Sequence, residues 1–132
     1  MATQVELKRI IITETSDQQV IFLKEVGGER AFPIVIGSTE AFAIDRRLKN
    51  QPTPRPQTHE LLSTVIEKLE AKLERILITD LQEGTYFAQL VIRHGNGKIV
   101  EVDSRPSDAI ALGVSNNVPI FVADHIFNEL GN

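Results

Sequence analysis

Three carboxylates lie where the sequence passes from a strand into a helix. Glu40 falls in the first turn of one expected helix, Asp108 in the first turn of another, and Asp103 ends the strand before Asp108. A helix dipole favours negative charge in the first turn, so Glu40 and Asp108 are expected to be ionised. Either each carboxylate complements its own helix terminus, or the two helix starts converge with Asp103 to hold a divalent ion such as Mg²⁺ or Mn²⁺.

A histidine begins the most regular helical pattern in the chain. His59 follows Thr58, a plausible helix cap, and the amide dipoles of a first turn disfavour a charged imidazolium. A neutral ring can accept a proton from an attacking water or donate to a phosphate oxygen. In the alternative, the ring packs over Leu62 and Ile66 while a ring nitrogen bonds to the preceding proline-rich loop. His94 and His125 are expected to be surface residues.

Arginines near these carboxylates are candidates for phosphate contacts. Arg105 lies between two acids, so it either clamps a phosphate or forms a structural tie to Asp103 or Asp108. Four further basic residues fall within ten positions: Arg46, Arg47, Lys49 and Arg55. They form either a local basic ridge or a solvated helix face that runs into a loop.

Composition limits the possible functions. The 132 residues are 42% hydrophobic and 24% charged, as in a globular domain, and the absence of cysteine excludes disulfides, thiolate metal sites and cysteine nucleophiles. Lys and Arg number 14 against 18 Asp and Glu, which gives 14 − 18 = −4. This balance argues against tight non-specific nucleic-acid binding by bulk charge. The patterns GxxxxGK[ST], GxGxxG, HExxH and GxSxG do not occur, so the corresponding sites have no support.

Targeting signals are not evident in the sequence. The longest apolar runs are far shorter than the roughly 20 residues that a spanning helix needs. The first residues, MATQVELKR, lack the basic and apolar regions of a secretory signal. We therefore expect a cytoplasmic protein without a membrane span.

Periodicity predicts one α+β domain over residues 1–132, with a mixed, mostly antiparallel sheet and about four helices. Alternating or β-branched runs predict strands at 5–14, 19–26, 30–36, 75–81, 85–93, 98–103 and 118–123. Helical spacing predicts helices at 37–50, 58–73, 104–117 and 125–130. The prolines of 51–57 predict a stiff connector, and apolar residues around the third helix predict that it is buried.

Four segments resemble the bifunctional nuclease domain, in the same order and with compact spacing. They are FPIVIGSTEAFAI (32–44), PRPQTHELL (54–62), VDSRPSDAIALG (102–113) and PIFVAD (119–124). The resemblance implies a compact α+β fold, a homo-oligomer that is most simply a dimer, and nuclease activity towards DNA and RNA. The family's shared polar residues fall on Glu40, Arg55, His59, Asp103, Arg105, Ser107 and Asp108.

These residues and the resemblance lead to a hypothesis of a nuclease that cuts phosphodiesters of DNA and RNA with little sequence preference. In this hypothesis, Glu40, Asp103 and Asp108 hold Mg²⁺ or Mn²⁺. The catalytic residues are His59, which activates water, together with Glu40 and Asp108. The phosphate contacts come from Arg46, Arg47, Arg55, Arg105 and Ser107. The alternative is a non-catalytic binding or regulatory module that recognises a protein or a small anionic ligand.

Overall fold

The computed structural model describes residues 1–131 and contains seven strands, four α-helices and one 3₁₀ helix. The strands are β1 (Ala2–Ile11), β2 (Gln18–Glu25), β3 (Ala31–Gly37), β4 (Ala71–Gln82), β5 (Thr85–His94), β6 (Ile99–Ser104) and β7 (Ile120–Ala123). The helices are α1 (Ser38–Leu48), α2 (Thr58–Lys68), α3 (Pro106–Gly113), η1 (Val114–Asn116) and α4 (Asp124–Glu129). None of the helices in this part of the chain is long and apolar enough to cross a membrane.

All seven strands form one sheet in the order β3-β2-β1-β7-β4-β5-β6. Two antiparallel meanders make up its halves, and β7 joins them by pairing antiparallel with β1 and parallel with β4. The single parallel pair makes the sheet mixed. The structure confirms the predicted single α+β domain with a mostly antiparallel sheet and four helices.

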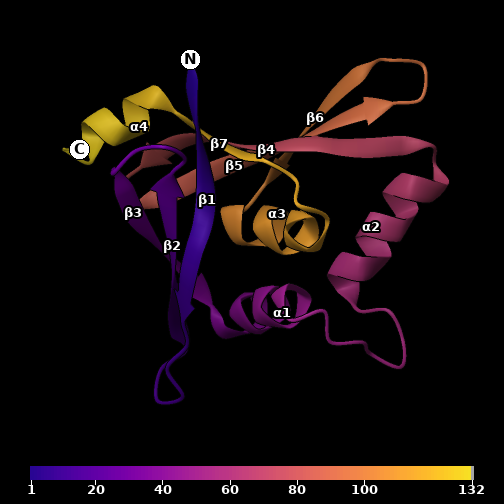
Figure 1. Ribbon diagram of the computed structural model, residues 1–132, viewed down its shortest axis with the longest axis horizontal. Helices are drawn as coiled ribbons and strands as arrows, with labels where there is room; N and C mark the ends of the chain where they lie inside the picture. Colours follow the sequence, from indigo (N-terminus) through magenta and orange to yellow (C-terminus); the bar gives the residue numbers. More distant parts are fainter. Residues whose placement is uncertain (132) are drawn as a thin grey trace.

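The sheet curls, so that its two halves enclose α3 (Figure 1). Phe32 on β3 stacks on Tyr86 of β5 with ring centroids 5.6 Å apart, although four strands separate β3 from β5 in the sheet. Phe127 of α4 meets Phe32 edge to face at 5.6 Å. The curl therefore brings the edge strand β3 close to the β4–β5 hairpin.

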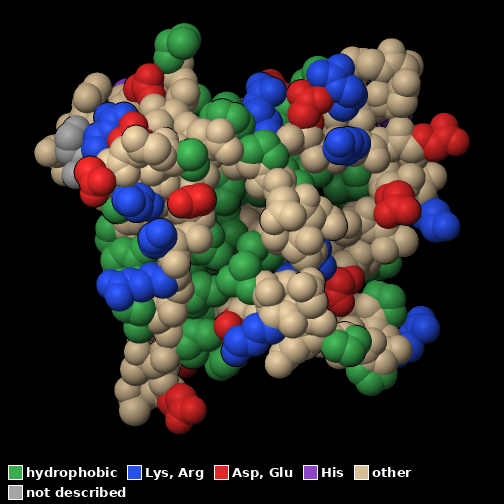
Figure 2. Space-filling model, in the orientation of Figure 1, with side chains coloured by type: hydrophobic (Ala, Val, Ile, Leu, Met, Phe, Trp, Pro, Cys, Tyr) green, Lys and Arg blue, Asp and Glu red, His purple; other side chains and the backbone are tan. Residues whose placement is uncertain are grey.

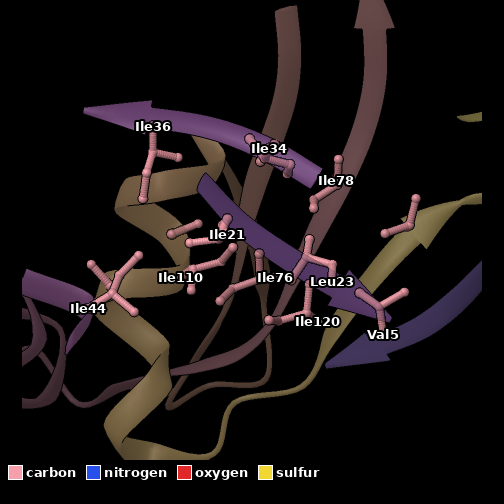
Figure 3. Close-up of a cluster of buried hydrophobic side chains, with 14 of the residues drawn as sticks. Val5, Ile21, Leu23, Ile34, Ile36, Ile44, Ile76, Ile78, Ile110 and Ile120 are labelled. Carbon is pink, nitrogen blue, oxygen red and sulfur yellow. The ribbon is translucent and has the colours of Figure 1, made fainter. Parts of the chain in front are cut away.

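Alternation along the strands explains the core inside this curl. On β3, Phe32, Ile34 and Ile36 point inward, while the residues between them are exposed. Isoleucines from both halves of the sheet meet Ile110 of α3 and Ile44 of α1, as Figure 3 shows. Seven of the eight residues of α3 are buried, which confirms the prediction for this helix and fixes the position of its first turn.

The structure corrects the length of the second helix. Helical spacing continues through Leu69 and Leu73, but α2 ends at Lys68 and β4 begins at Ala71. Glu70 turns the chain with a positive φ of 60°, which few non-glycine residues adopt. Leu73 packs against the core from β4 instead, because an inward strand position buries it as well as a helix face would.

Several predicted boundaries were wrong by one to three residues. β1 covers Ala2–Ile11 rather than 5–14. Gln57, not Thr58, caps α2. The Gln57 backbone N–H donates a hydrogen bond to Glu60 Oε2 at 3.5 Å. Arg105, not Ser104, caps α3, because Pro106 occupies the first helical position, where its missing N–H costs nothing.

Candidate functional site

The first turn of α3 carries two of the candidate residues. Pro106 starts the helix and holds Arg105 in an extended conformation, with φ −72° and ψ 144°. Asp108 lies in the first turn, where the helix dipole favours its charge. Because α3 is packed into the core on nearly all sides, this end is a rigid platform for the two side chains.

Arg105 joins the starts of α1 and α3. Its Nη2 lies 2.8 Å from Asp108 Oδ2, and its Nη1 lies 3.3 Å from Glu40 Oε1. The hydrogen bond to Asp108, with the charges of Asp108 and Glu40, raises the pKa of the Arg105 guanidinium. The structural tie expected for Arg105 is confirmed, yet its side chain stays 64% exposed and retains a face for an anion.

His59 brings the start of α2 into the same network. Its Nε2 lies 3.1 Å from Asp108 Oδ1, and its side chain is only 14% exposed. An ionised carboxylate only accepts hydrogen bonds, so a neutral imidazole in this contact carries its proton on Nε2 and keeps a lone pair on Nδ1. The alternative for His59, a ring nitrogen bonded to the proline-rich loop, is not the contact observed for Nε2, whose partner is Asp108.

A groove of about 650 Å³ runs along the Glu40 and Arg105 end of this network, and neither His59 nor Asp108 is among its lining residues. One wall is the edge strand β3, another is the end of the β4–β5 hairpin, and the third is the start of α3 with Glu40, Arg105 and Ser107. Thr85 and Tyr86 of the hairpin also line it, and burial raises the pKa of the Tyr86 phenol. No motif or spacing pointed to Thr85 and Tyr86, because only the curl of the sheet brings them close to α3.

The predicted basic ridge is divided. Arg47 is 9% exposed, and its guanidinium donates to the Leu112 carbonyl at 3.0 Å and to Ser115 Oγ at 2.7 Å. Burial lowers the pKa of Arg47. Arg46 bonds to the Gln57 side chain. Arg47 thus ties α1 to the end of α3, and its spacing from Ala43 and Ile44 places it on the buried face of α1.

The remaining candidates lie around the network. Arg55 is exposed in the proline-rich connector that leads into His59, and Ser107 is buried within the first turn of α3 at the groove. Asp103 is exposed on the edge strand β6, in register with Gln89 of β5. No hydrogen bond or ion pair joins Asp103 to the other candidates in residues 1–131.

The predicted magnesium or manganese site depends on oxygens that already have cationic or imidazole partners. Both oxygens of Asp108 are engaged, Oδ1 by His59 and Oδ2 by Arg105, and Glu40 faces the same guanidinium. A metal ion at Glu40 and Asp108 would compete with Arg105 for them. Within residues 1–131, the group of three metal-binding side chains that is close enough to share an ion lies elsewhere, at Asp80, His125 and Glu129.

Surface charge is mixed on one face of the molecule. On the face shown in Figure 2, Lys and Arg side chains lie among Asp and Glu side chains rather than in one continuous basic stripe. Together with the net charge of −4, this distribution limits attraction of a polyanion from a distance. Phosphate binding would therefore depend on local contacts such as those of Arg105 and Arg55.

Comparison with known proteins assigns the family. The model of the bifunctional nuclease domain matches residues 21–132. An uncharacterised protein of Mycobacterium tuberculosis is 35% identical over 128 residues, which cover 97% of this chain and 76% of that protein. Bifunctional nuclease 1 of Oryza sativa subsp. indica is 26% identical over 84% of this chain. Bifunctional nuclease 1 of Arabidopsis thaliana is 26% identical over 81% of this chain. The aligned part covers 34% of each plant protein. The chain therefore belongs to the bifunctional nuclease domain family.

Proposed function

We propose that the protein is a nuclease that hydrolyses phosphodiester bonds of DNA and RNA with little sequence preference. The observation that carries the proposal is the chain of contacts from His59 through Asp108 to Arg105 and Glu40, the last two of which line an open groove. The family assignment and the names of the plant relatives support the choice of nucleic acid as substrate.

Each side chain of the network suits one part of the reaction. His59, oriented by Asp108, is the general base that takes a proton from the attacking water at Nδ1. Arg105 and Ser107 grip the phosphate and stabilise the negative charge that develops on it. Contacts to phosphate carry no base information, so a site of this kind cuts with little regard for sequence and accepts both DNA and RNA.

A divalent ion would supply further charge stabilisation and a more acidic bound water. Glu40, Asp103 and Asp108 would hold Mg²⁺ or Mn²⁺ in exchange for the contacts that Glu40 and Asp108 make with Arg105. This exchange predicts a nuclease that depends on added Mg²⁺ and is inhibited by a chelator.

The first test is cleavage of end-labelled single-stranded DNA and RNA by the purified chain with Mg²⁺ or with chelator. His59→Gln should lose at least about 10²-fold in rate, the usual contribution of a general base. His94→Gln is the matched control, because His94 ends β5 and is exposed. Equal rates for wild type and His59→Gln would show that the cleavage does not come from this site.

The second test separates the nuclease from the alternative, a module that binds a protein or a small anionic ligand without catalysis. Phosphate contacts release counterions, so oligonucleotide affinity should fall steeply with added salt, and Arg105→Gln should reduce the salt slope by about one. Arg93→Gln, a variant of an exposed arginine paired with Glu74, should leave the slope unchanged. No salt dependence would favour the alternative.

We further infer that the chain forms a homo-oligomer, most simply a dimer. Apolar side chains remain uncovered on α2: Leu61 and Val65 lie one turn apart, and Leu69, at 66% exposed, follows the helix. Exposed apolar groups at this spacing are typical of a surface that another chain covers. Light scattering should give twice the mass of the chain, and a monomeric mass at all concentrations would contradict the inference.

A further inference from the structure

Three potential metal ligands meet at the end of β4 that lies away from α2. Figure 1 shows α4 beside this end of the strand. Asp80 lies on β4, while His125 and Glu129 lie on α4, four residues apart and therefore on one face of the helix. One ligand atom from each of the three residues lies within 4.8 Å of the other two.

The Asp80 carboxylate is oriented by groups outside this cluster. The Leu81 backbone N–H donates to Oδ1 at 2.8 Å, and Gln82 Nε2 donates to Oδ2 at 2.6 Å. Such outer partners fix the direction of a carboxylate ligand and are a regular feature of protein metal sites. On the inner side, His125 Nε2 lies 3.2 Å from Asp80 Oδ1.

Charge within the cluster is not balanced by the protein. Asp80 and Glu129 bring two negative charges, and in residues 1–131 Glu129 makes no ion pair or hydrogen bond through its side chain. Among the described residues, His125 is the basic side chain paired with Asp80, and an imidazole that binds a metal ion is neutral, so the ion would meet two carboxylate charges. A divalent ion would neutralise the group and use the otherwise unpaired Glu129.

We propose that Asp80, His125 and Glu129 bind a divalent transition-metal ion such as Zn²⁺. An imidazole nitrogen with two carboxylate oxygens suits Zn²⁺ and other first-row transition metals, whereas Mg²⁺ and Ca²⁺ prefer oxygen ligands alone. Three protein ligands leave a position open for water. The bound ion cross-links α4 to β4, next to Leu81 and Leu130, which line the groove near Arg105.

This site is separate from the nuclease proposal in residues and in chemistry. Glu40, His59 and Asp108 belong to the starts of α1, α2 and α3, and none of them is part of the cluster on β4 and α4. Metal binding can therefore be measured without any nuclease assay, and failure of either proposal leaves the other standing.

The test uses the full chain without a polyhistidine tag, stripped of metal and titrated with Co²⁺ and Zn²⁺ in excess Mg²⁺. Wild type should bind one ion, give visible Co²⁺ absorption bands and melt at a higher temperature with Zn²⁺. Asp80→Asn, His125→Ala and Glu129→Gln should each weaken binding at least about tenfold and lose the Zn²⁺-dependent rise in melting temperature. Circular dichroism checks that each variant is folded.

Two controls decide the result. His94→Ala removes an exposed histidine outside the cluster and should bind like the wild type. Gln82→Ala keeps all three ligands and should weaken binding about 10-fold to 100-fold through the loss of the outer partner of Asp80. Absence of Co²⁺ bands in the wild type, or equal binding by wild type and His125→Ala, would overturn the proposal.

Discussion

His59 Nε2 lies 3.1 Å from Asp108 Oδ1, although 49 positions separate the two residues in the sequence. The contact joins the first turns of α2 and α3 and holds the imidazole in one tautomer. An aspartate with this role acts through the histidine, because it keeps Nδ1 available as the base and stabilises the imidazolium that forms when Nδ1 takes a proton.

Asp108→Asn tests this relationship. An asparagine can donate to the histidine as well as accept, so it permits the wrong tautomer while preserving size. We expect the cleavage rate to fall by about 10²–10⁴-fold, as for loss of general base catalysis. Glu101→Gln is the comparison, because Glu101 is an exposed carboxylate outside the network. A rate for Asp108→Asn equal to that of the wild type would show that the contact between His59 and Asp108 has no part in cleavage.

Gly37→Ala tests the position of Glu40. An added Cβ at Gly37 would lie 2.8 Å from Glu40 Oε1, so the carboxylate must shift, and this oxygen is the one that contacts Arg105 Nη1. The moving atom ends a flexible side chain, and the free energy of unfolding should change by less than about 1 kcal/mol. We expect slower cleavage with little change in urea denaturation.

The double variant Gly37→Ala with Glu40→Gln completes this test. Since both substitutions act on the same carboxylate, their effects on the cleavage rate should not add. Additive losses would show that Gly37 influences the site by some route other than Glu40.

Local patterns predicted most of the fold. β3 is buried on one side, and its apolar residues alternate with exposed ones. α3 is buried on nearly all sides, and most of its residues are apolar or small. Both kinds of burial can therefore be predicted from the order of residue types. The error at α2 arose because Leu69 and Leu73 continue the helical spacing of the apolar residues, although Leu69 only caps the helix and Leu73 lies on β4. The turn between them places Glu70 at φ 60°. Glutamate rarely adopts this conformation, so the sequence did not predict a turn there.

The site was predictable in its residue types and only partly in its contacts. Glu40 and Asp108 were recognisable because helix starts favour carboxylates, His59 because it begins the most regular helical pattern, and Arg105 because it stands between two acids. The pairing of His59 with Asp108, and the wall that Tyr86 contributes to the groove, depend on how the sheet curls. No spacing in the sequence encodes that curvature.

Arg47→Ala tests whether this arginine is structural. Its removal leaves the buried Leu112 carbonyl without the donor that lies 3.0 Å away, at a cost of about 1–3 kcal/mol in the free energy of unfolding. Urea denaturation measures this loss. The salt dependence of oligonucleotide binding should have the same slope in Arg47→Ala as in the wild type. A smaller slope would show that Arg47 contacts phosphate.

Glu74 on β4 gives a prediction about pH. Arg93 of β5 donates to it from Nη2 at 3.2 Å, and this hydrogen bond, with the charges of nearby basic residues, lowers the pKa of Glu74 below its ordinary value of 4.5. A lowered folded-state pKa means that the ionised carboxylate stabilises the fold above about pH 4.5. That contribution disappears as the pH falls through the folded-state pKa.

Glu74→Gln removes this dependence while keeping the shape of the side chain. The variant should be less stable than the wild type at pH 7, and the two melting temperatures should converge as the pH falls below about 4.5. Glu101→Gln is the matched control, since Glu101 is an exposed strand residue without an ion pair in residues 1–131. Added salt should also narrow the difference at pH 7, because both partners are partly exposed and their attraction is screened. A difference in melting temperature that is the same at pH 7 and pH 3 would show that Glu74 acts through packing rather than through its charge.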